Sequence, residues 1–252
     1  MSKGQLQGKV ALVTGGSRGL GRAAVERLAR DGATVLFTYR SQEAAAREVE
    51  EAVALEGGSA HPLQADLCTH AGVMALFGAV EERLGVGKSL DILVANAGII
   101  QDRRLDEVRE ADFDAVFDLN VKGVFFTAQQ AARRMRDGGR IVLLGTGLTR
   151  FAFPQYIVYG AAKGALTTLA HYLAAELGPR GITANVLAPG AIDTDMNPGL
   201  RTEQGAAHIS GITALGRVGH ADDIADAIAF LAGPDSRWVT AQRVEASGGM
   251  KL

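Results

Sequence analysis

A tyrosine and a lysine four residues apart are the side chains in this sequence with the clearest chemical potential. Tyr159 and Lys163 stand at the two ends of Y-G-A-A-K, and a spacing of four places both on one face of a helix. A phenol has a pKa of about 10, too high for acid/base work near neutrality, but an adjacent ammonium stabilises the phenolate and lowers that value. The pair therefore predicts a tuned proton donor. The alternative is a surface tyrosine beside a solvated lysine.

A glycine-rich turn near the N-terminus indicates a phosphate site. The stretch from Val10 to Ala23, V-A-L-V-T-G-G-S-R-G-L-G-R-A, is typical of a buried parallel strand, a tight turn and the start of a helix. Gly15, Gly19 and Gly21 let backbone N–H groups approach a pyrophosphate, and the helix dipole favours the anion. Because the chain holds 32 glycines, the spacing alone is weak support, and the strand-turn-helix context carries the prediction of a bound dinucleotide.

The end of the second predicted strand favours NADP(H) over NAD(H). An NAD-binding chain places an acidic residue there for the ribose 2′-hydroxyl, whereas this chain has Arg40 and Ser41. A guanidinium binds a 2′-phosphate with two hydrogen bonds, and an acid would repel it. Arg18, inside the glycine turn, is a second candidate for the same phosphate. The alternative is that both arginines are solvated surface residues and the cofactor is NAD.

Strands and helices alternate along the chain and position these residues. Strands are expected at 10–13, 33–39, 59–65, 90–95, 140–145, 182–187 and 243–246. Helices are expected at 22–31, 42–55, 69–84, between 106 and 137, 158–177 and 221–231, with a loop before Gly219. Pro62 cannot donate to a ladder, so the third strand is predicted at a sheet edge. The alternation predicts an α/β chain with one domain over 1–252, a doubly wound Rossmann fold whose seven-stranded parallel sheet has helices on both faces.

Composition excludes several classes of partner. The net charge is -2, with 47% hydrophobic residues, so there is no basic field for nucleic acid and no polybasic patch for a membrane. The five histidines and Cys68 are too scattered to suggest a metal site, and one cysteine allows no internal disulfide. No apolar run approaches the roughly 18 residues that span a bilayer, and the polar start lacks a signal-peptide core. We expect a cytoplasmic protein without a metal that acts on a small molecule.

Six motifs in a fixed order resemble the short-chain dehydrogenase/reductase family. They are T-G-x-x-x-G-x-G at 14–21, A-N-A-G at 95–98, N-V-K-G at 120–123, Y-x-x-x-K at 159–163, P-G-A-I-D-T-D-M at 189–196 and S-G-G-M at 247–250. The match covers the full chain, and the joint order and spacing are far more specific than any single motif. The resemblance implies an NADP-dependent oxidoreductase that transfers a hydride between the cofactor and a carbonyl carbon.

The resemblance also implies a role for individual residues. It makes Tyr159 the catalytic acid, has Lys163 lower the pKa of that tyrosine and hold the nicotinamide ribose, and has Asn120 support a proton relay through water and Lys163. Asp66 and Leu67 would flank the adenine. The residues expected around the cofactor are Gly15, Ser17, Arg18, Gly19, Leu20, Gly21, Arg40, Ser41, Asp66, Leu67, Asn96, Ala97, Gly98, Tyr159, Lys163, Pro189, Gly190, Ile192 and Thr194.

Two positions depart from the family pattern. The family usually places a serine thirteen residues before the tyrosine, and this chain has Thr146 there. Threonine keeps a hydroxyl for the substrate carbonyl, but its methyl group stiffens the side chain and narrows the pocket. We therefore expect Thr146 to be catalytic and the accepted substrate shape to change. Ala95 replaces the first asparagine of N-N-A-G, with a small structural effect expected.

Two segments expected near the nicotinamide are apolar and predict a bulky hydrophobic ketone. The first carries Leu148, Phe151, Phe153, Pro154 and Tyr156, and the second carries Met196, Pro198, Leu200, His208, Ile209 and Ile212. For each aromatic residue singly, packing in the core is an equally good interpretation. The chain resembles both 3-oxoacyl-carrier-protein reductases and actinobacterial aromatic polyketide ketoreductases of the angucycline type. The motifs do not separate these two groups.

Two functional classes remain open, an NADPH-dependent ketoreductase and a non-catalytic NADPH-binding sensor. The full set of Asn120, Thr146, Tyr159 and Lys163 favours the enzyme. The ketone is either free or bound to a carrier protein, whose acidic surface three arginines could steer. These are Arg103, Arg104 and Arg150, for which plain surface exposure is the alternative. The resemblance further implies a homotetramer assembled through the helices around 108–136 and 158–178.

Overall fold

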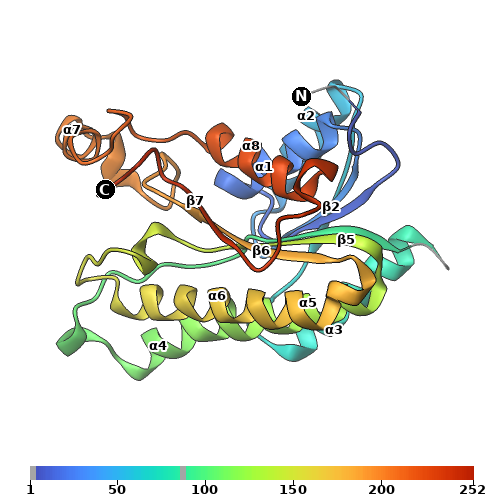
Figure 1. Ribbon diagram of the computed structural model, residues 1–252, viewed down its shortest axis with the longest axis horizontal. Helices are drawn as coiled ribbons and strands as arrows, with labels where there is room; N and C mark the ends of the chain where they lie inside the picture. The colour runs from blue at the N-terminus through green and yellow to red at the C-terminus, as the bar shows by residue number, and fades with distance from the viewer. Residues whose placement is uncertain (1–3, 86–88) are drawn as a thin grey trace.

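The computed structural model describes residues 4–85 and 89–252, which contain a seven-stranded parallel sheet with helices on both faces (Figure 1). The strands lie in the order β3-β2-β1-β4-β5-β6-β7. Their bounds are β1 Val10–Val13, β2 Thr34–Tyr39, β3 Ser59–Gln64, β4 Leu90–Ala95, β5 Met135–Leu144, β6 Thr183–Pro189 and β7 Arg243–Ala246. The predicted doubly wound sheet is confirmed, and its strand order reverses between β1 and β4, where such sheets bind ligands.

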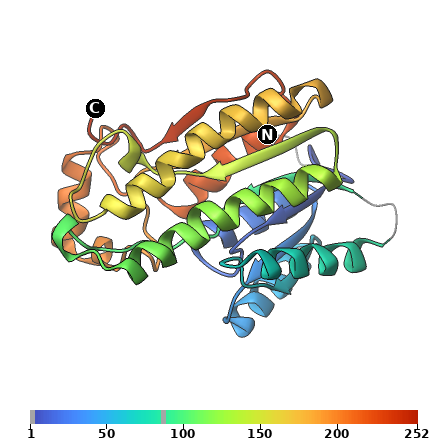
Figure 2. The same ribbon diagram turned by 90° about the horizontal axis from the view of Figure 1, so that it is seen from below.

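Strand β1 has apolar side chains on both faces of the sheet, and helices cover both faces. Its four residues are all buried; Ala11 and Val13 pack in one hydrophobic cluster, and Val10 and Leu12 pack in the other. The first cluster lies under α1 (Gly19–Arg30), α2 (Glu43–Leu55) and α8 (Ala221–Ala232), and the second under α3 (His70–Leu84), α5 (Val124–Arg134) and α6 (Ile157–Leu177). Figure 2 views this second face, where α3 and α5 lie side by side. Alternate residues of one apolar strand thus bind the two helix layers to the sheet.

The third strand lies at the sheet edge, as its proline predicts. β3 is the terminal strand and pairs with β2, with Pro62 opposite Phe37. An edge position leaves one side of the strand outside the ladder, so the missing N–H of proline is tolerated there.

The helical region predicted between 106 and 137 is divided into pieces. These are a 3-10 turn η1 (Leu105–Glu107), α4 (Glu110–Phe117), a π-helical turn η2 (Asp118–Gly123) and α5. The helix ends at Arg134, and β5 begins at Met135 rather than at Arg140. The extra length of β5 passes Gly138, whose φ of +77° lies in the left-handed region, and the register against β4 shifts between Leu90 and Ile92. The glycine conformation thus lets the strand start early at the cost of an irregular register.

A helix also occurs where the sequence predicts a loop before Gly219. α7 (Glu203–Gly211) follows a short 3-10 turn η5 (Pro198–Arg201), and the Thr202 hydroxyl accepts a hydrogen bond from Gly205 N at its start. The helix buries none of its residues, so no apolar stripe marked it in the sequence. The remaining 3-10 turns are η3 (Gly147–Thr149), η4 (Gly178–Arg180) and η6 (Pro234–Ser236). None of the described helices is long and apolar enough to cross a membrane.

Candidate active site

The glycine turn follows β1 and disfavours side chains at three of its positions, two through backbone conformation and one through lack of space. Gly15 and Gly19 have φ of +68° and +54°, which strain any residue with a Cβ. A side chain on Gly21 would collide with the Gly15 carbonyl oxygen and approach the Asn96 amide to 2.6 Å. The turn therefore brings the start of α1 close to the backbone of β1, as a phosphate-binding turn requires.

The first turn of α1 suits an anion. Arg18 occupies the N-cap position, its side chain makes no capping hydrogen bond in the described structure, and the first turn contains no acidic residue. In contrast, Asp223 closes the N-terminus of α8 by accepting from His220 N at 2.8 Å. The leading N–H groups of α1 thus lack the side-chain acceptor that α8 has, and a phosphate oxygen would supply it.

Three polar side chains hold the glycine turn in place. Asn96 Nδ2 donates to the carbonyl oxygens of Thr14 and Gly15 at 2.9 and 3.1 Å. Thr14 Oγ1 accepts from Asn96 N and Ala97 N, and Thr38 Oγ1 accepts from Gly15 N at 3.0 Å. No sequence motif identifies Thr38, although a threonine near the carboxyl end of a mostly apolar strand is a usable signal. Asn96, which is predicted to line the cofactor, lies beside the turn, where its side chain braces the backbone.

Arg40 lies at the end of β2 beside the end of β3. Its side chain is 70% exposed, with Nη2 3.7 Å from Asp66 Oδ2, so the ion pair is weak and the guanidinium is accessible to a ligand. The hydrogen bond from the Cys68 backbone N–H lowers the pKa of Asp66, and the charge of Arg40 contributes. Burial, followed by Asp66, raises the pKa of the Cys68 thiol. The predicted phosphate-binding and adenine-flanking residues therefore lie together.

The predicted catalytic residues converge from three elements. Tyr159 and Lys163 lie in α6, Thr146 follows β5, and Asn120 lies in the π-helical turn η2. Thr146 lies close enough to Tyr159 to lower the pKa of the phenol, and Lys163 Nζ lies 5.9 Å from the centre of the Tyr159 ring. All four residues are buried, at 9% exposure or less. The alternative of a surface tyrosine beside a solvated lysine is thereby excluded.

Main-chain groups fix the positions of the Lys163 ammonium and the Asn120 side-chain amide. Lys163 Nζ donates to the carbonyl oxygen of Leu144 at 2.7 Å. Asn120 accepts from Ile99 N at 2.9 Å and donates to Ile99 O at 2.8 Å. A Cβ on Gly98 would lie 3.1 Å from Asn120 Oδ1 and 3.3 Å from Lys163 Nζ, so glycine allows these groups to meet. Leu144 and Ile99 act through their backbone, which no residue-type pattern reveals.

Burial dominates the protonation of the tyrosine and the lysine. It raises the pKa of Tyr159 to about 12, against a lowering by the hydrogen bond with Thr146. It lowers the pKa of Lys163 to about 8. In the protein alone the effect of burial on the Tyr159 pKa is the larger one, because desolvation penalises the phenolate, and the predicted lowering of the Tyr159 pKa by Lys163 stays a prediction. The buried phenol keeps its proton at neutral pH.

The segment after β6 reaches the glycine turn. Gly190 N donates to Ala246 O at 3.1 Å, and both Ile192 and Thr194 are buried. A Cβ on Gly19 would lie 3.6 Å from the Thr194 side chain. The predicted cofactor residues at 189–194 therefore meet those at 15–21 across the sheet. Within residues 4–85 and 89–252, no cluster of histidine, cysteine and acidic side chains could hold a metal ion.

A hollow of about 410 Å³ is lined by residues that precede and follow Tyr159 in the sequence. Four residues of the first predicted apolar segment line it, namely Leu148, Phe153, Pro154 and Tyr156. The remaining lining is Arg104, Leu105, Asp106, Ala152, Ile157, Gly160 and Ala161. Phe151 packs near Gly147 and meets Phe153 edge to face, with ring centres 6.0 Å apart. Thr146 and Tyr159 are not part of this lining, so the hollow adjoins the predicted catalytic residues and does not enclose them.

Arg150, one of the three arginines considered for steering a carrier protein, is paired within the protein, and its role toward a carrier stays a prediction. Its guanidinium binds Glu245 through two hydrogen bonds and also donates to the carbonyl oxygens of Met250 and Lys251. Arg103 and Arg104 remain exposed. An arginine so engaged serves the structure of the C-terminal segment, since its donors are already used.

A glycine turn at the switch point of a parallel sheet, joined to a buried Thr/Tyr/Lys set, defines a dinucleotide-dependent oxidoreductase. The family model described as enoyl-(acyl carrier protein) reductase matches residues 15–251. The chain belongs to the short-chain dehydrogenase/reductase family, which confirms the predicted family and the predicted class of enzyme.

Characterised structures and curated relatives extend this comparison. The angucycline C-6 ketoreductase LanV, solved with NADP, is 40% identical, with a TM-score of 0.93 over 100% of this chain and 98% of that chain. LanV has also been solved with NADP and rabelomycin, at a TM-score of 0.90. LugOII, a promiscuous reductase that catalyses keto-reduction at C1 during lugdunomycin biosynthesis, is 41% identical, with a TM-score of 0.93 over 98% and 100% of the two chains. A hydroxynaphthalene reductase-like protein of Metarhizium guizhouense is 37% identical over 97% of this chain and 95% of its own.

Proposed function

We propose that the protein is an NADPH-dependent ketoreductase that reduces the carbonyl group of a hydrophobic, polyketide-type or polycyclic aromatic ketone to an alcohol. The observation that carries the proposal is the burial of Thr146 and Tyr159 close to each other, with Lys163 one helical turn further along α6. Such a pair presents two hydroxyl groups to one carbonyl oxygen, and one of them is a proton donor.

NADP(H) fits the residues around the glycine turn. The turn leaves no room for side chains where a pyrophosphate approaches, and the uncapped start of α1 provides N–H donors. Arg40, exposed at the end of β2, and Arg18, exposed at the start of α1, would hold the 2′-phosphate. The bound cofactor supplies the hydride. LanV, which shares 40% of its sequence with this chain, binds NADP.

The residues of the chain would orient the ketone and deliver the proton. Thr146 and Tyr159 donate hydrogen bonds to the carbonyl oxygen, and Tyr159 transfers its proton as negative charge develops there. Lys163 is positively charged below its pKa of about 8 and stabilises the resulting phenolate. Both polar ends of the Asn120 side chain are bound to Ile99, so the proposed proton relay would use the main-chain carbonyl of Asn120.

A fused-ring ketone is the substrate class that the surroundings favour. Leu148, Phe153, Pro154 and Tyr156 form an apolar wall beside Tyr159, and such walls bind flat hydrophobic ligands. LanV has been solved with rabelomycin, and LugOII is named for keto-reduction. Arg150, one of the three arginines considered for steering a carrier protein, forms an ion pair with Glu245. This pairing favours a free ketone over a carrier-bound one.

A homotetramer and a cytoplasmic location remain part of the proposal. Phe113, Phe125 and Tyr172, on α4, α5 and α6, are 42%, 45% and 72% exposed, and large apolar groups on adjoining helices favour association. Light scattering of the purified protein would test the tetramer.

The deciding experiment is NADPH consumption with a panel of ketones. The panel contains quinones, decalones and acetoacetyl thioesters, and loss of NADPH absorbance is the measurement. We expect turnover with the cyclic ketones and little with the thioesters. Preference for the thioesters would instead indicate a 3-oxoacyl-carrier-protein reductase. Tight NADPH binding without turnover of any ketone would indicate a sensor.

A further inference from the structure

Thr146 is held through its backbone by a side chain from the last strand. The carbonyl oxygen of Thr146 accepts a hydrogen bond from Arg243 Nη2 at 3.1 Å and another from Thr149 Oγ1 at 3.0 Å. The Thr146 hydroxyl, by contrast, accepts from Leu148 N at 3.3 Å and lies on the side of Tyr159, whose pKa it lowers. Since the carbonyl and the side chain extend from one Cα atom, fixing the carbonyl constrains the direction of the hydroxyl.

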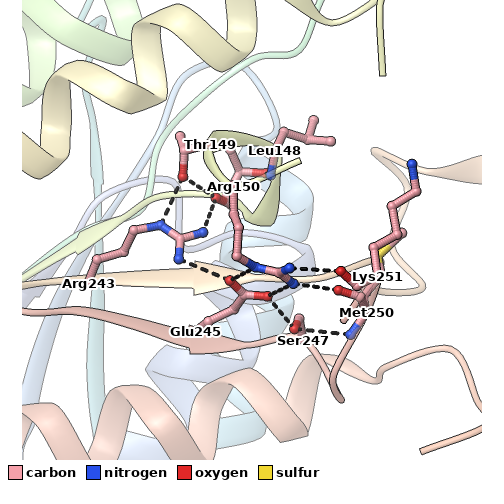
Figure 3. Close-up of polar contacts among 9 residues, drawn as sticks. Leu148, Thr149, Arg150, Arg243, Glu245, Ser247, Met250 and Lys251 are labelled. Atoms are coloured by element: carbon pink, nitrogen blue, oxygen red, sulfur yellow. Dashed lines mark hydrogen bonds and ion pairs between the residues drawn. The ribbon is translucent and has the colours of Figure 1, made fainter. Parts of the chain in front are cut away.

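Arg243 is itself fixed by two further bonds. Its Nε donates to Thr149 Oγ1 at 2.9 Å, and its Nη1 donates to Glu245 Oε2 at 3.0 Å. Figure 3 shows its guanidinium reaching both groups from β7. The side chains of Arg243 and Glu245 are only 20% and 18% exposed. In such a partly desolvated setting these bonds are stronger than those of a surface ion pair.

Glu245 ties the same network to the C-terminal residues. It accepts two hydrogen bonds from Arg150, at 2.9 and 2.7 Å, and one from Ser247 Oγ at 2.6 Å. Arg150, then Ser247 and Arg243, hold the pKa of Glu245 at about 2, against the effect of burial. Arg150 continues to the carbonyl oxygens of Met250 and Lys251 (Figure 3). The carboxylate is therefore charged at neutral pH, and the network is permanent there.

From these contacts we propose that Arg243 is a positioning residue for the reaction, acting through the Thr146 carbonyl to aim the Thr146 hydroxyl at the substrate oxygen. The inference rests on the proposed function of Thr146. A competing interpretation is that Arg243 only joins β7 to the loop after β5. If Arg243 had only this structural role, replacing it would lower the free energy of unfolding. Any effect on turnover would then be the same with or without the Thr146 hydroxyl.

A double-mutant cycle distinguishes the two interpretations. Arg243→Met keeps the length of the side chain and removes its donors, and Thr146→Val removes the hydroxyl. We expect Arg243→Met to lower kcat about tenfold, the order of loss that follows from a modest misplacement. NADPH affinity, measured by fluorescence titration, should stay within about twofold. In the Thr146→Val background, Arg243→Met should cause no further loss of kcat, because the group that it aims is gone.

The matched control is Arg150→Met, which loses the same partner, Glu245, but whose other bonds go to the C-terminal segment. We expect it to lower kcat less than Arg243→Met and by the same factor in both backgrounds. Should Arg243→Met fail to fold, Thr149→Val carries the test, since Thr149 is the other side-chain donor to the Thr146 carbonyl. Like Arg243→Met, Thr149→Val should lower kcat when Thr146 is present and should cause no further loss of kcat in the Thr146→Val background.

Two results overturn the inference alone. One is an equal loss of kcat from Arg243→Met in both backgrounds, and the other is a near wild-type kcat in folded Arg243→Met protein. An unchanged kcat in Thr146→Val itself would refute both the inference and the proposed role of Thr146, so the two failures are distinguishable.

Discussion

Replacing Tyr159 with phenylalanine tests the proton donor directly. The change removes one oxygen from a side chain that is 9% exposed, so the packing of the ring against its neighbours is kept. Loss of the phenol hydroxyl and of its interaction with Thr146 should lower the free energy of unfolding by no more than about 1 kcal/mol. The protein should therefore fold, and it should bind NADPH with little change because the glycine turn is untouched.

The catalytic effect should be much larger than the effect on stability. A positioned general acid contributes about 10²- to 10⁴-fold, and the lost hydrogen bond to the carbonyl oxygen adds to it. We expect kcat for a good ketone to fall by at least about a hundredfold in Tyr159→Phe. In that variant Thr146 and Lys163 remain, so the residual rate measures what the other donors achieve without a proton from Tyr159.

Tyr156→Phe is the matched control. Tyr156 is half-buried and lines the hollow next to Gly160, but the residue four positions further on is a glycine rather than a lysine. Loss of the Tyr156 hydroxyl should act through substrate fit. We expect a change mainly in KM and a fall in kcat of less than about tenfold. Both variants are assayed by NADPH consumption, with circular dichroism to verify folding. A near wild-type kcat in folded Tyr159→Phe would refute the mechanism and leave the family assignment to describe the fold.

Three further predictions address the cofactor and the pH dependence. Arg40→Asp should replace an attraction of about 1.5 to 3 kcal/mol for the 2′-phosphate with repulsion and turn the preference toward NADH; equal affinity of the wild-type protein for both cofactors, measured by titration, would contradict the role of Arg40. Gly21→Ala should weaken NADPH binding at least about tenfold, because its Cβ collides with the Gly15 carbonyl oxygen, whereas Gly78→Ala, where nothing lies within 4 Å, should not. Lys163 is charged below its pKa of about 8 and neutral above it, while Tyr159 keeps its proton until about pH 12, so kcat for reduction should fall as pH rises through about 8. A kcat that stays level to pH 10 would show that the Lys163 charge is not required.

The sequence by itself determined the doubly wound α/β type of the fold and the main chemical groups of the candidate site, because these depend on local patterns. The four apolar residues of β1, the glycines after them and the Tyr159/Lys163 spacing are each set by neighbours along the chain. Pro62 likewise placed β3 at the edge through a property of one residue. The π-helical turn at Asn120 and the polar helix α7 have no such pattern, and both escaped prediction.

Only the tertiary structure decided which partners the polar groups find. The sequence left Arg150 as either a surface residue or a candidate for steering a carrier protein. In the structure it binds Glu245, 95 positions away, since the order of the sheet brings β7 beside β6 and near the loop after β5. Arg243 reaches the Thr146 carbonyl across 97 positions for the same reason. The pKa of Tyr159 also depends on how deeply the fold buries it, and desolvation outweighs the pairing that the sequence spacing suggested. Residue types specify what each group can do, whereas burial and distant neighbours set its charge and its direction.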